Sequence, residues 1–340
     1  MQQDESTEYP LIDENSPDVI MALLQDMGLC ENDEKIGSIS KAGEGNMNVV
    51  LRVGLSDRSL IVKQSRPWVA KYPSIAAPDD RIVAELNFYK YVQDSPSVTA
   101  ALPKILGDDI SRRTIVMEDL GAASDYSSLY TSENGLAESS PVFEKAIAWL
   151  SQLHQTVVKK TNDSTVGCYE LRELNHAHIF TIPMQAGAVD LNSICDGLQS
   201  NSDFILGDEQ LRTALKTLGD QYLASGEHLL HGDYYPGSWL KTDAGFRVID
   251  PEFCFAGPIE FDLGVLAAHW IFCGAAPDRS TVDLVGRLYD DSSVDLAVVS
   301  QFAGVELIRR LIGVAQLPLK AELQQRVSWL KTGRSLVLEG

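Results

Sequence analysis

Residues 229–253, which read LLHGDYYPGSWLKTDAGFRVIDPEF, constrain the fold of this chain more than any other stretch. Two short β-prone runs, residues 239–241 and 246–249, flank a turn that contains Gly245 and together predict a β-hairpin. In a hairpin, the residue before the first strand and the residue after the second strand lie at the same end. Acidic residues occupy both of these places, so the hairpin is expected to bring them together.

The acids at the two ends of this hairpin are Asp233, Asp250 and Glu252. Pro251 favours an extended conformation for Asp250, and side chains two positions apart on an extended chain point the same way. Asp250 and Glu252 are therefore expected to form a pair of carboxylates, with Asp233 close by. Three acids in a small space repel one another unless they share a cation. This arrangement is typical of a Mg²⁺–phosphate site with a separate acid that receives a proton.

The net charge of −20 argues against binding to a nucleic-acid backbone or to an anionic membrane surface. It does not exclude ATP, whose charge Mg²⁺ partly neutralises. The five cysteines are scattered, without a C-x-x-C pair, which favours reduced thiols in a cytoplasmic protein. The first ten residues are polar and acidic, unlike a signal peptide, and the longest apolar stretch, residues 263–276, is too short to span a bilayer. We expect that stretch to form a buried helix.

The N-terminal third shows a helix and then a hairpin. Ser16-Pro17 predicts a helix start, and Gly28 predicts the stop after about Met27. Residues 36–53 follow as two β-prone runs whose tip is Gly43-Glu44-Gly45-Asn46. Glycines at such a tip let backbone N–H groups approach phosphate oxygens, although the same pattern is common in plain turns. On this motif alone, a plain turn is the better interpretation.

A lysine and a glutamate further along form a candidate ion pair. Lys63 lies near the end of the apolar strand 59–64, where a lysine usually reaches towards solvent. Residues 79–94 have helical spacing, and Glu85 falls on the apolar face of that helix. A buried acid needs a partner, and Lys63 is the natural candidate. Residues 66–78 between these elements are proline-broken and are expected to be irregular, either covering a substrate or packing on the surface.

The second part of the chain is predicted to be mainly helical. Residues 114–121 suggest an edge strand that leads into a linker and keeps backbone groups free for a planar base. We expect His154 to be a core or interface histidine. Asp262 is expected either to cap the apolar helix or to support the 229–253 hairpin through backbone hydrogen bonds, and support is the favoured interpretation. Arg309 and Arg310 are adjacent on a predicted helix, where neighbouring side chains diverge by about 100°. One is therefore expected to pair with an acid such as Glu306, and the other to reach a polar substrate.

The order of these parts resembles the aminoglycoside and choline kinase group of the protein-kinase-like fold, and within it most closely the 5-methylthioribose kinases. The resemblance extends over about residues 36–315 and rests on these segments: GEGNMNVV (43–50), LIVKQ (60–64), DRIVAE (80–85), IVMEDL (115–120), HGD…GS (231–238), VIDPEF (248–253), GPIEFDLG (257–264) and IRRLIGVA (308–315). It implies an α+β fold with two lobes. The N-terminal lobe, residues 1–118, would contain an antiparallel sheet, and the C-terminal lobe, residues 119–340, would be mainly helical and catalytic.

The resemblance also implies a role for each matching residue, with ATP and Mg²⁺ as cofactors. Asp233 would be the catalytic base, and Asp250 and Glu252 would hold Mg²⁺. Substrate hydroxyls would be bound by Arg309 or Arg310, with Tyr72 of the covering loop also in contact with the substrate. The nucleotide would contact Gly43, Gly45, Asn46, Lys63, Glu85 and the backbone of Glu118 and Leu120.

The resemblance implies a small-molecule kinase whose acceptor is the 1-hydroxyl of 5-methylthioribose. The loop after the base reads Asp-Tyr-Tyr-Pro-Gly-Ser where the family has Asp-Leu-His-Thr-Gly-Ser, and residues 234–236 lie where the acceptor would sit. The acceptor is therefore less well specified than the phosphoryl-transfer residues. An aminoglycoside, choline or another small alcohol is the first alternative, and a nucleotide-binding module without catalysis is the second. A homodimer is compatible with the resemblance, whereas nucleic-acid and membrane partners are not expected.

Overall fold

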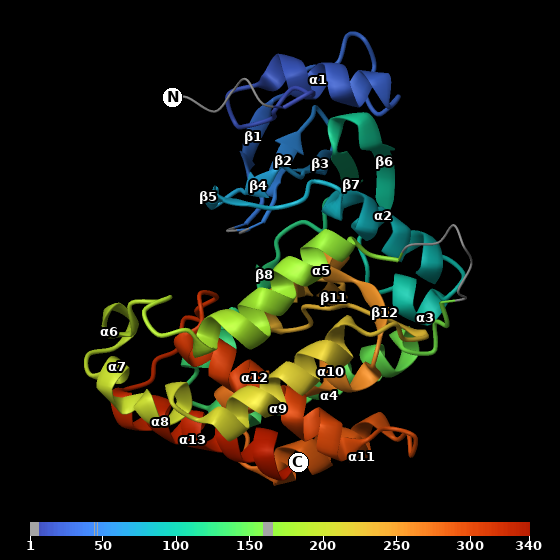
Figure 1. The fold of residues 1–340 in the computed structure, drawn as a ribbon. Helices are drawn as coiled ribbons and strands as arrows, with labels where there is room; N and C mark the ends of the chain where they lie inside the picture. The colour runs from blue at the N-terminus through green and yellow to red at the C-terminus, as the bar shows by residue number, and fades with distance from the viewer. Residues whose placement is uncertain (1–6, 44, 46, 159–165) are drawn as a thin grey trace. The chain divides into compact units, whose positions relative to one another are not determined.

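The computed structural model describes residues 7–43, 45, 47–158 and 166–340 (Figure 1). Its contacts divide the chain into two compact units. Unit 1 consists of Met1–Ala123, Thr165–Leu171 and Thr242–Phe253, and unit 2 of Ser124–Ser164, Arg172–Lys241 and Cys254–Gly340. The single domain boundary expected between residues 118 and 119 stays a prediction.

Unit 1 is built on a five-stranded antiparallel sheet with strand order β1-β2-β3-β7-β6. The expected hairpin of residues 36–53 and the strand 59–64 are confirmed. Residues 114–121 were expected to form an edge strand, which is wrong, because β7 pairs with β3 on one side and with β6 on the other. The strands of the sheet are β1 (Ser38–Lys41), β2 (Val49–Gly54), β3 (Ser59–Gln64), β6 (Ile105–Asp109) and β7 (Thr114–Glu118).

A helix packs on each face of this sheet. Successive side chains of a strand point to opposite faces, and accordingly Val116 lies in the core cluster under helix α1, whereas Ile115 and Met117 pack against helix α2. Helix α1 (Pro17–Asp26) stops where Gly28 adopts a φ of 69°, as the sequence predicted. Helix α2 (Arg81–Val92) is the helix expected in residues 79–94.

Residues 66–78 were expected to be irregular, and this is wrong. They contain a short antiparallel hairpin of β4 (Trp68–Val69) and β5 (Tyr72–Ala76). The prolines at positions 67, 73 and 78 hid it, because proline lacks an N–H and suggests a break in any strand. In a two-stranded hairpin every strand is an edge, where proline is tolerated. The remaining elements of unit 1 are α3 (Pro96–Thr99), η1 (Ile110–Arg112), β11 (Gly245–Val248) and η6 (Pro251–Phe253).

Unit 2 is mainly helical, and its centre is helix α10 (Ile259–Phe272), the buried helix that the apolar stretch predicted. Except for Glu260, every residue of α10 is buried. Helix α12 (Leu296–Ile312) packs closely against it, since a Cβ built on Gly264 would come within 2.5 Å of the Phe302 Cβ. The other long helices of unit 2 are α4 (Gly135–Leu153), α9 (Glu209–Leu223), α11 (Arg279–Tyr289) and α13 (Leu323–Glu339), and α13 lies beside α12 (Figure 1).

Short strands in unit 2 position the loop that carries Asp233, between β9 (His228–Leu230) and β10 (Trp239–Thr242). β9 pairs with β12 (Phe255–Gly257), and β10 pairs with β8 (Ser124–Asp125). The β-prone runs 239–241 and 246–249 therefore form strands, as predicted, in β10 and β11. The remaining elements are η2 (Ser127–Thr131), α5 (Tyr169–His176), η3 (Ala177–Thr181), η4 (Ile182–Met184), α6 (Leu191–Ile194), α7 (Leu198–Asn201), α8 (Asp203–Leu206) and η5 (Pro236–Ser238).

The expected α+β organisation, with an antiparallel sheet in the N-terminal part and a helical C-terminal part, is confirmed. None of the helices in the described parts of the chain combines the length and the apolar content needed to cross a membrane.

Candidate active site

A buried lysine is the centre of the candidate site in unit 1. The Lys63 Nζ lies 2.7 Å from Glu85 Oε2 and 2.7 Å from Asp250 Oδ1. The side chains of Lys63 and Glu85 are each only 1% exposed, whereas that of Asp250 is 44% exposed. The ion pair expected between Lys63 and Glu85 is confirmed, and Asp250 adds a second carboxylate that faces solvent.

The charges in this cluster depend on one another. Burial alone would lower the pKa of Lys63, but the carboxylates of Asp250 and Glu85 outweigh it and raise that pKa above its ordinary value. Burial raises the pKa of Glu85 to about 7, although the ammonium of Lys63 acts in the opposite direction. The lysine is therefore a fixed positive charge inside unit 1.

Asp250 has a backbone conformation that the sequence did not predict. Its φ is 61°, in the left-handed region, and residues 251–253 form a 3₁₀ turn rather than extended chain. Pro251 disfavours the right-handed helical region for the residue before it, and aspartate tolerates the left-handed region better than most residues do. The expectation of an extended pair, with Asp250 and Glu252 pointing the same way along a strand, is wrong.

Glu252 lies deeper than Asp250 and is held by two polar side chains. It is 5% exposed, and its Oε2 accepts a hydrogen bond from Asn48 Nδ2 at 2.8 Å and lies 3.4 Å from Arg81 Nε. Burial raises the pKa of Glu252, while Lys63 and Arg81 lower it. Sequence reasoning missed Asn48 and Arg81. The signals were an asparagine where a kinase-type loop has its third glycine and an arginine at the start of an amphipathic helix.

Asp250 and Glu252 fit a magnesium ion better than a metal held by protein alone. In the described part of the chain, no three His, Cys, Asp or Glu side chains converge on a place that could hold a metal ion. Magnesium commonly takes one or two carboxylates and completes its octahedron with phosphate oxygens and water. Because both carboxylates interact electrostatically with Lys63, a cation bound to them would lie near a fixed positive charge, an arrangement that also requires an anion such as a phosphate.

The glycines of the β1–β2 tip are not explained by crowding within the protein. A Cβ built on Gly43 would have no heavy atom within 4 Å, and one on Gly45 would meet its nearest neighbour at 3.6 Å. Among the described residues, packing therefore leaves both positions open to a side chain. Glu44 and Asn46 lie outside the described residues.

At the end of the strand expected to contact a base, the backbone amide of Glu118 is already occupied. The Glu118 amide donates to the Lys104 carbonyl at 2.9 Å, and the Lys104 amide donates to Glu118 Oε2 at 3.1 Å. Both bonds arise because β6 lies beside β7. A base could therefore not use the Glu118 amide, and Leu120 comes just after the strand ends.

In unit 2, Asp262 supports the loop that carries Asp233, as the sequence predicted. The His231 amide donates to Asp262 Oδ2 at 2.8 Å, and the Gly232 amide donates to Asp262 Oδ1 at 3.0 Å. Gly232 has a φ of 83°, which favours glycine there. His154 is buried against the same carboxylate at 3.3 Å, which confirms it as a core histidine. These contacts fix the backbone immediately before Asp233.

Both arginines of α12 reach the same carboxylate, which contradicts the expectation that they diverge. Asp233 Oδ1 lies 3.4 Å from Arg309 Nη2 and 3.3 Å from Arg310 Nη2. Glu306, one turn earlier, lies 2.8 Å from Arg309 Nε through Oε2 and 2.7 Å from Arg310 Nε through Oε1. Adjacent side chains leave the helix backbone about 100° apart. The two long side chains nevertheless converge, because each Nε pairs with one oxygen of the same acid, Glu306.

Glu306 is held in turn by a buried histidine. Its Oε1 lies 3.0 Å from His269 Nε2, and His269 Nδ1 lies 2.6 Å from the Tyr130 hydroxyl. Burial lowers the pKa of His269 to about 4, so the ring is neutral at pH 7. Since the carboxylate can only accept, the neutral ring donates a hydrogen bond from Nε2 and accepts one from the Tyr130 hydroxyl at Nδ1. The guanidinium of Arg310 also lies 4.7 Å from the centre of the Tyr235 ring.

Arg309 and Arg310 outweigh the effect of burial on Glu306 and lower its pKa below the ordinary range. Glu306 is therefore ionised, and two carboxylates and two guanidinium groups balance one another around Asp233. Tyr72 belongs to unit 1: it lies on β5, is 48% exposed, and has the Lys71 ammonium 5.8 Å from its ring centre. Its expected contact with substrate stays a prediction.

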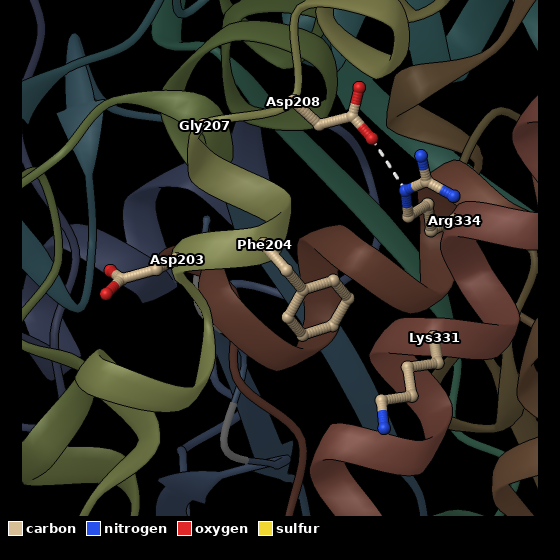
Figure 2. A pocket seen from close by; sticks show the side chains of 6 residues that line it. All are labelled: Asp203, Phe204, Gly207, Asp208, Lys331 and Arg334. Atoms are coloured by element: carbon tan, nitrogen blue, oxygen red, sulfur yellow. Dashed lines mark hydrogen bonds and ion pairs between the residues drawn. The ribbon is translucent and has the colours of Figure 1, made fainter.

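A surface pocket of about 540 Å³ elsewhere in unit 2 contains none of the candidate site residues. Figure 2 shows it between α8 and α13, with the Phe204 ring directed into it and an ion pair of 2.6 Å between Asp208 and Arg334 at its rim. Its other lining residues are Asp203, Gly207 and Lys331. The pocket mixes both charges with one exposed ring and suggests no particular chemistry.

Comparisons with known proteins agree with the geometry. The model of the phosphotransferase enzyme family (APH) matches residues 39–290. A methylthioribose kinase of Exiguobacterium sibiricum is 29% identical over 345 aligned positions, which cover 88% of this chain and 84% of that protein. The structure of the choline kinase LicA from Streptococcus pneumoniae superposes with a TM-score of 0.52 at 16% identity, covering 94% of this chain and 98% of that one. A spectinomycin phosphotransferase in complex with ADP and spectinomycin gives a TM-score of 0.50 at 14% identity, covering 94% and 96%. The likeness to these structures confirms the expected kinase-like fold.

Replacing Glu306 by glutamine tests the charge balance around the arginines. The amide keeps the shape but removes the negative charge that both buried guanidinium groups share, so the free energy of unfolding should fall by roughly 3 kcal/mol. Urea denaturation followed by circular dichroism measures this change.

The matched control for Glu306→Gln is Asp283→Asn, which breaks the exposed ion pair with Arg279 in the same unit. This control should change the free energy of unfolding by less than about 1 kcal/mol. Equal effects of the two substitutions would contradict the buried charge balance.

Proposed function

Because the chain belongs to the phosphotransferase enzyme family and transfers a phosphoryl group to the alcohol of a small molecule, we propose that it phosphorylates the 1-hydroxyl of 5-methylthioribose with Mg²⁺ and ATP. The observation that carries the proposal is the buried Lys63 between Glu85 and the half-exposed Asp250. A lysine held charged inside the protein next to a solvent-facing carboxylate supports a site for phosphate and a divalent cation together.

The nucleotide is assigned to unit 1. Lys63 contacts the α- and β-phosphates, and Glu85 fixes the direction of its ammonium group. The backbone around Gly43 and Gly45, where a side chain would have open space, approaches the phosphates. The Glu118 carbonyl and the Leu120 amide bond the adenine. Among the expected nucleotide contacts, Asn46 is proposed from the sequence alone.

The metal ion is assigned to Asp250 and Glu252. When bound, Mg²⁺ neutralises charge on the transferred phosphoryl group and its leaving group. The chain itself supplies the positions of the two carboxylates: the 3₁₀ turn 251–253 fixes their spacing, and Asn48 with Arg81 limits the movement of Glu252.

Asp233 is assigned as the base. The acceptor hydroxyl oxygen forms a bond to the γ-phosphorus, the bond from that phosphorus to the bridging oxygen of ADP breaks, and the hydroxyl proton moves to the Asp233 carboxylate. Asp262 fixes the backbone before Asp233, and the two arginines limit where its carboxylate can lie. Such positioning is the main contribution that a protein makes to phosphoryl transfer.

The surroundings of Asp233 favour a neutral sugar as acceptor. Arg309 and Arg310 present N–H donors beside the base, which suits sugar hydroxyls and disfavours an ammonium group at the same place. The methylthioribose kinase name of the Exiguobacterium relative points to the same acceptor. The net charge of −20 would suit a cationic choline or aminoglycoside, but this charge is spread over the whole chain.

A non-catalytic nucleotide-binding module is the remaining alternative. It is disfavoured because the chain keeps a complete set of charged groups for the reaction. A module that only bound a nucleotide would have no need of Asp233 or of the arginine pair beside it.

ATP consumption by the purified chain tests the proposed acceptor. Assays with and without Mg²⁺ should include 5-methylthioribose, ribose, choline and an aminoglycoside. We expect turnover only with 5-methylthioribose and Mg²⁺, and a product that carries phosphate on the former 1-hydroxyl. Turnover with choline or the aminoglycoside instead would replace the acceptor and keep the mechanism. ATP binding without turnover on any acceptor would favour the non-catalytic module.

Replacing Asp233 by asparagine tests the base. The amide cannot accept the hydroxyl proton, so kcat should fall by at least about 100-fold, while the dissociation constant for ATP stays within about twofold. The control is Asp243→Asn in the exposed turn before β11, which should leave both quantities unchanged. Retained turnover in Asp233→Asn would remove Asp233 from the role of base.

A further inference from the structure

One arginine in unit 1 uses its whole guanidinium group to join segments that lie far apart in sequence. Arg81 is the first residue of α2 and is fully buried. Its Nη1 donates to the carbonyls of Arg66 and Pro78 at 2.8 and 2.7 Å. Its Nη2 donates to the carbonyls of Met47 and Trp68 at 2.8 and 3.3 Å. These four acceptors come from the two ends of the 66–78 segment and from the chain just after the glycines.

The fifth N–H of the guanidinium group, at Nε, links the arginine through Asn48 to Glu252. Arg81 Nε donates to Asn48 Oδ1 at 2.8 Å, and Asn48 Nδ2 donates to Glu252 Oε2 at 2.8 Å. The Glu252 carboxylate, 3.4 Å from Arg81 Nε, also supplies the nearest negative charge. All five N–H groups of the arginine are thus used, and the amide of Asn48 joins the arginine to the carboxylate.

The hairpin also contacts Met47 directly. The Met47 carbonyl accepts the Ala70 amide at 3.2 Å as well as Arg81 Nη2. Met47 therefore lies between the β4–β5 turn and the arginine. A displacement of Glu252 would act on Asn48 and Arg81, and through them on both Met47 and the hairpin.

We propose that Arg81 is a positioning residue that couples Glu252 to the order of the β4–β5 hairpin, so that metal–nucleotide binding changes how firmly the hairpin is held. The proposal rests on the proposed function in one respect, namely that Glu252 holds the metal ion. A merely structural arginine would stabilise the hairpin equally with and without metal. The coupling instead requires the stability of the hairpin to depend on the metal and on the Asn48 bridge.

The chain contains a reporter for this coupling. Lys71 lies in the exposed turn between β4 and β5, so trypsin cleavage after Lys71 measures how often the hairpin opens. Cleavage after Arg66 does not interfere, because Pro67 follows it. The rate of cleavage at Lys71 should be measured by mass spectrometry without ligand, with ADP and EDTA, and with ADP and Mg²⁺. No acceptor is needed, so the identity of the acceptor does not affect the result.

In the unchanged protein, ADP with Mg²⁺ should slow cleavage at Lys71 several-fold more than ADP with EDTA does. Arg81→Lys keeps the charge but has three donors in place of five, so cleavage without ligand should become roughly tenfold faster. Asn48→Ala leaves the four bonds from Arg81 to backbone carbonyls in place. It should cleave without ligand at nearly the original rate but lose the extra protection that Mg²⁺ gives.

The control is Arg113→Gln, which removes ion pairs with Asp79 and Asp80 at the start of α2 without touching the hairpin. It should behave like the unchanged protein. The coupling is overturned if Asn48→Ala keeps the full Mg²⁺-dependent protection, or if the unchanged protein binds ADP and Mg²⁺ with no change in cleavage. A protein that shows no Mg²⁺-dependent nucleotide binding at all by calorimetry overturns the proposed function, and the coupling with it, so the two failures can be told apart.

Discussion

The ion pairs of the buried Lys63 are the interaction on which unit 1 depends. An ammonium group with 1% exposure is costly to bury unless carboxylates surround it. Glu85 supplies one carboxylate from the buried face of α2, and Asp250 supplies the other from the turn after β11. The pair with Glu85 ties β3 to α2, and the pair with Asp250 draws residues 242–253 into unit 1. The same interaction thus explains part of the architecture and the chemistry of the candidate site.

Unit 2 also pairs buried charges, but there a buried carboxylate, Glu306, lies between two guanidinium groups. Two guanidinium groups lie almost fully buried beside Asp233, and Glu306 compensates them from one turn earlier on the same helix. His269 stays neutral and uses one ring nitrogen to hold Glu306 and the other to accept from Tyr130. These contacts within unit 2 fix the direction of the two guanidinium groups towards Asp233, which suits the proposed role of Asp233 as the base.

Much of this could be predicted from local patterns. The pairing of Lys63 with Glu85 followed from a strand lysine and one acid on an apolar helix face, and the support by Asp262 followed from its place at the start of a buried helix. Both predictions needed only the spacing of apolar residues along one helix and the rule that a buried charge or polar group finds a partner.

Other features depended on contacts that no local pattern contains. The inner position of β7 required knowing that residues 105–109 pair with it, and the left-handed φ of Asp250 required knowing which of the conformations that Pro251 permits is adopted. The convergence of Arg309 and Arg310 could be predicted only by knowing that both side chains pair with the same acid, Glu306. Arg81 was missed because its partners are mostly backbone carbonyls. Every residue has a carbonyl, so the sequence does not show which ones will accept from the arginine.

Calorimetric titration of ADP in the presence of Mg²⁺ into Lys63→Met is the most direct test of the claim that the lysine cluster is the nucleotide-phosphate site. The dissociation constant should rise by at least about 100-fold, because a charge-assisted contact to phosphate is lost and buried carboxylates remain next to it. Lys104→Met, a lysine on the exposed approach to β6, should leave the constant unchanged. Equal binding by Lys63→Met and the unchanged protein, with both folded by circular dichroism, would contradict the account.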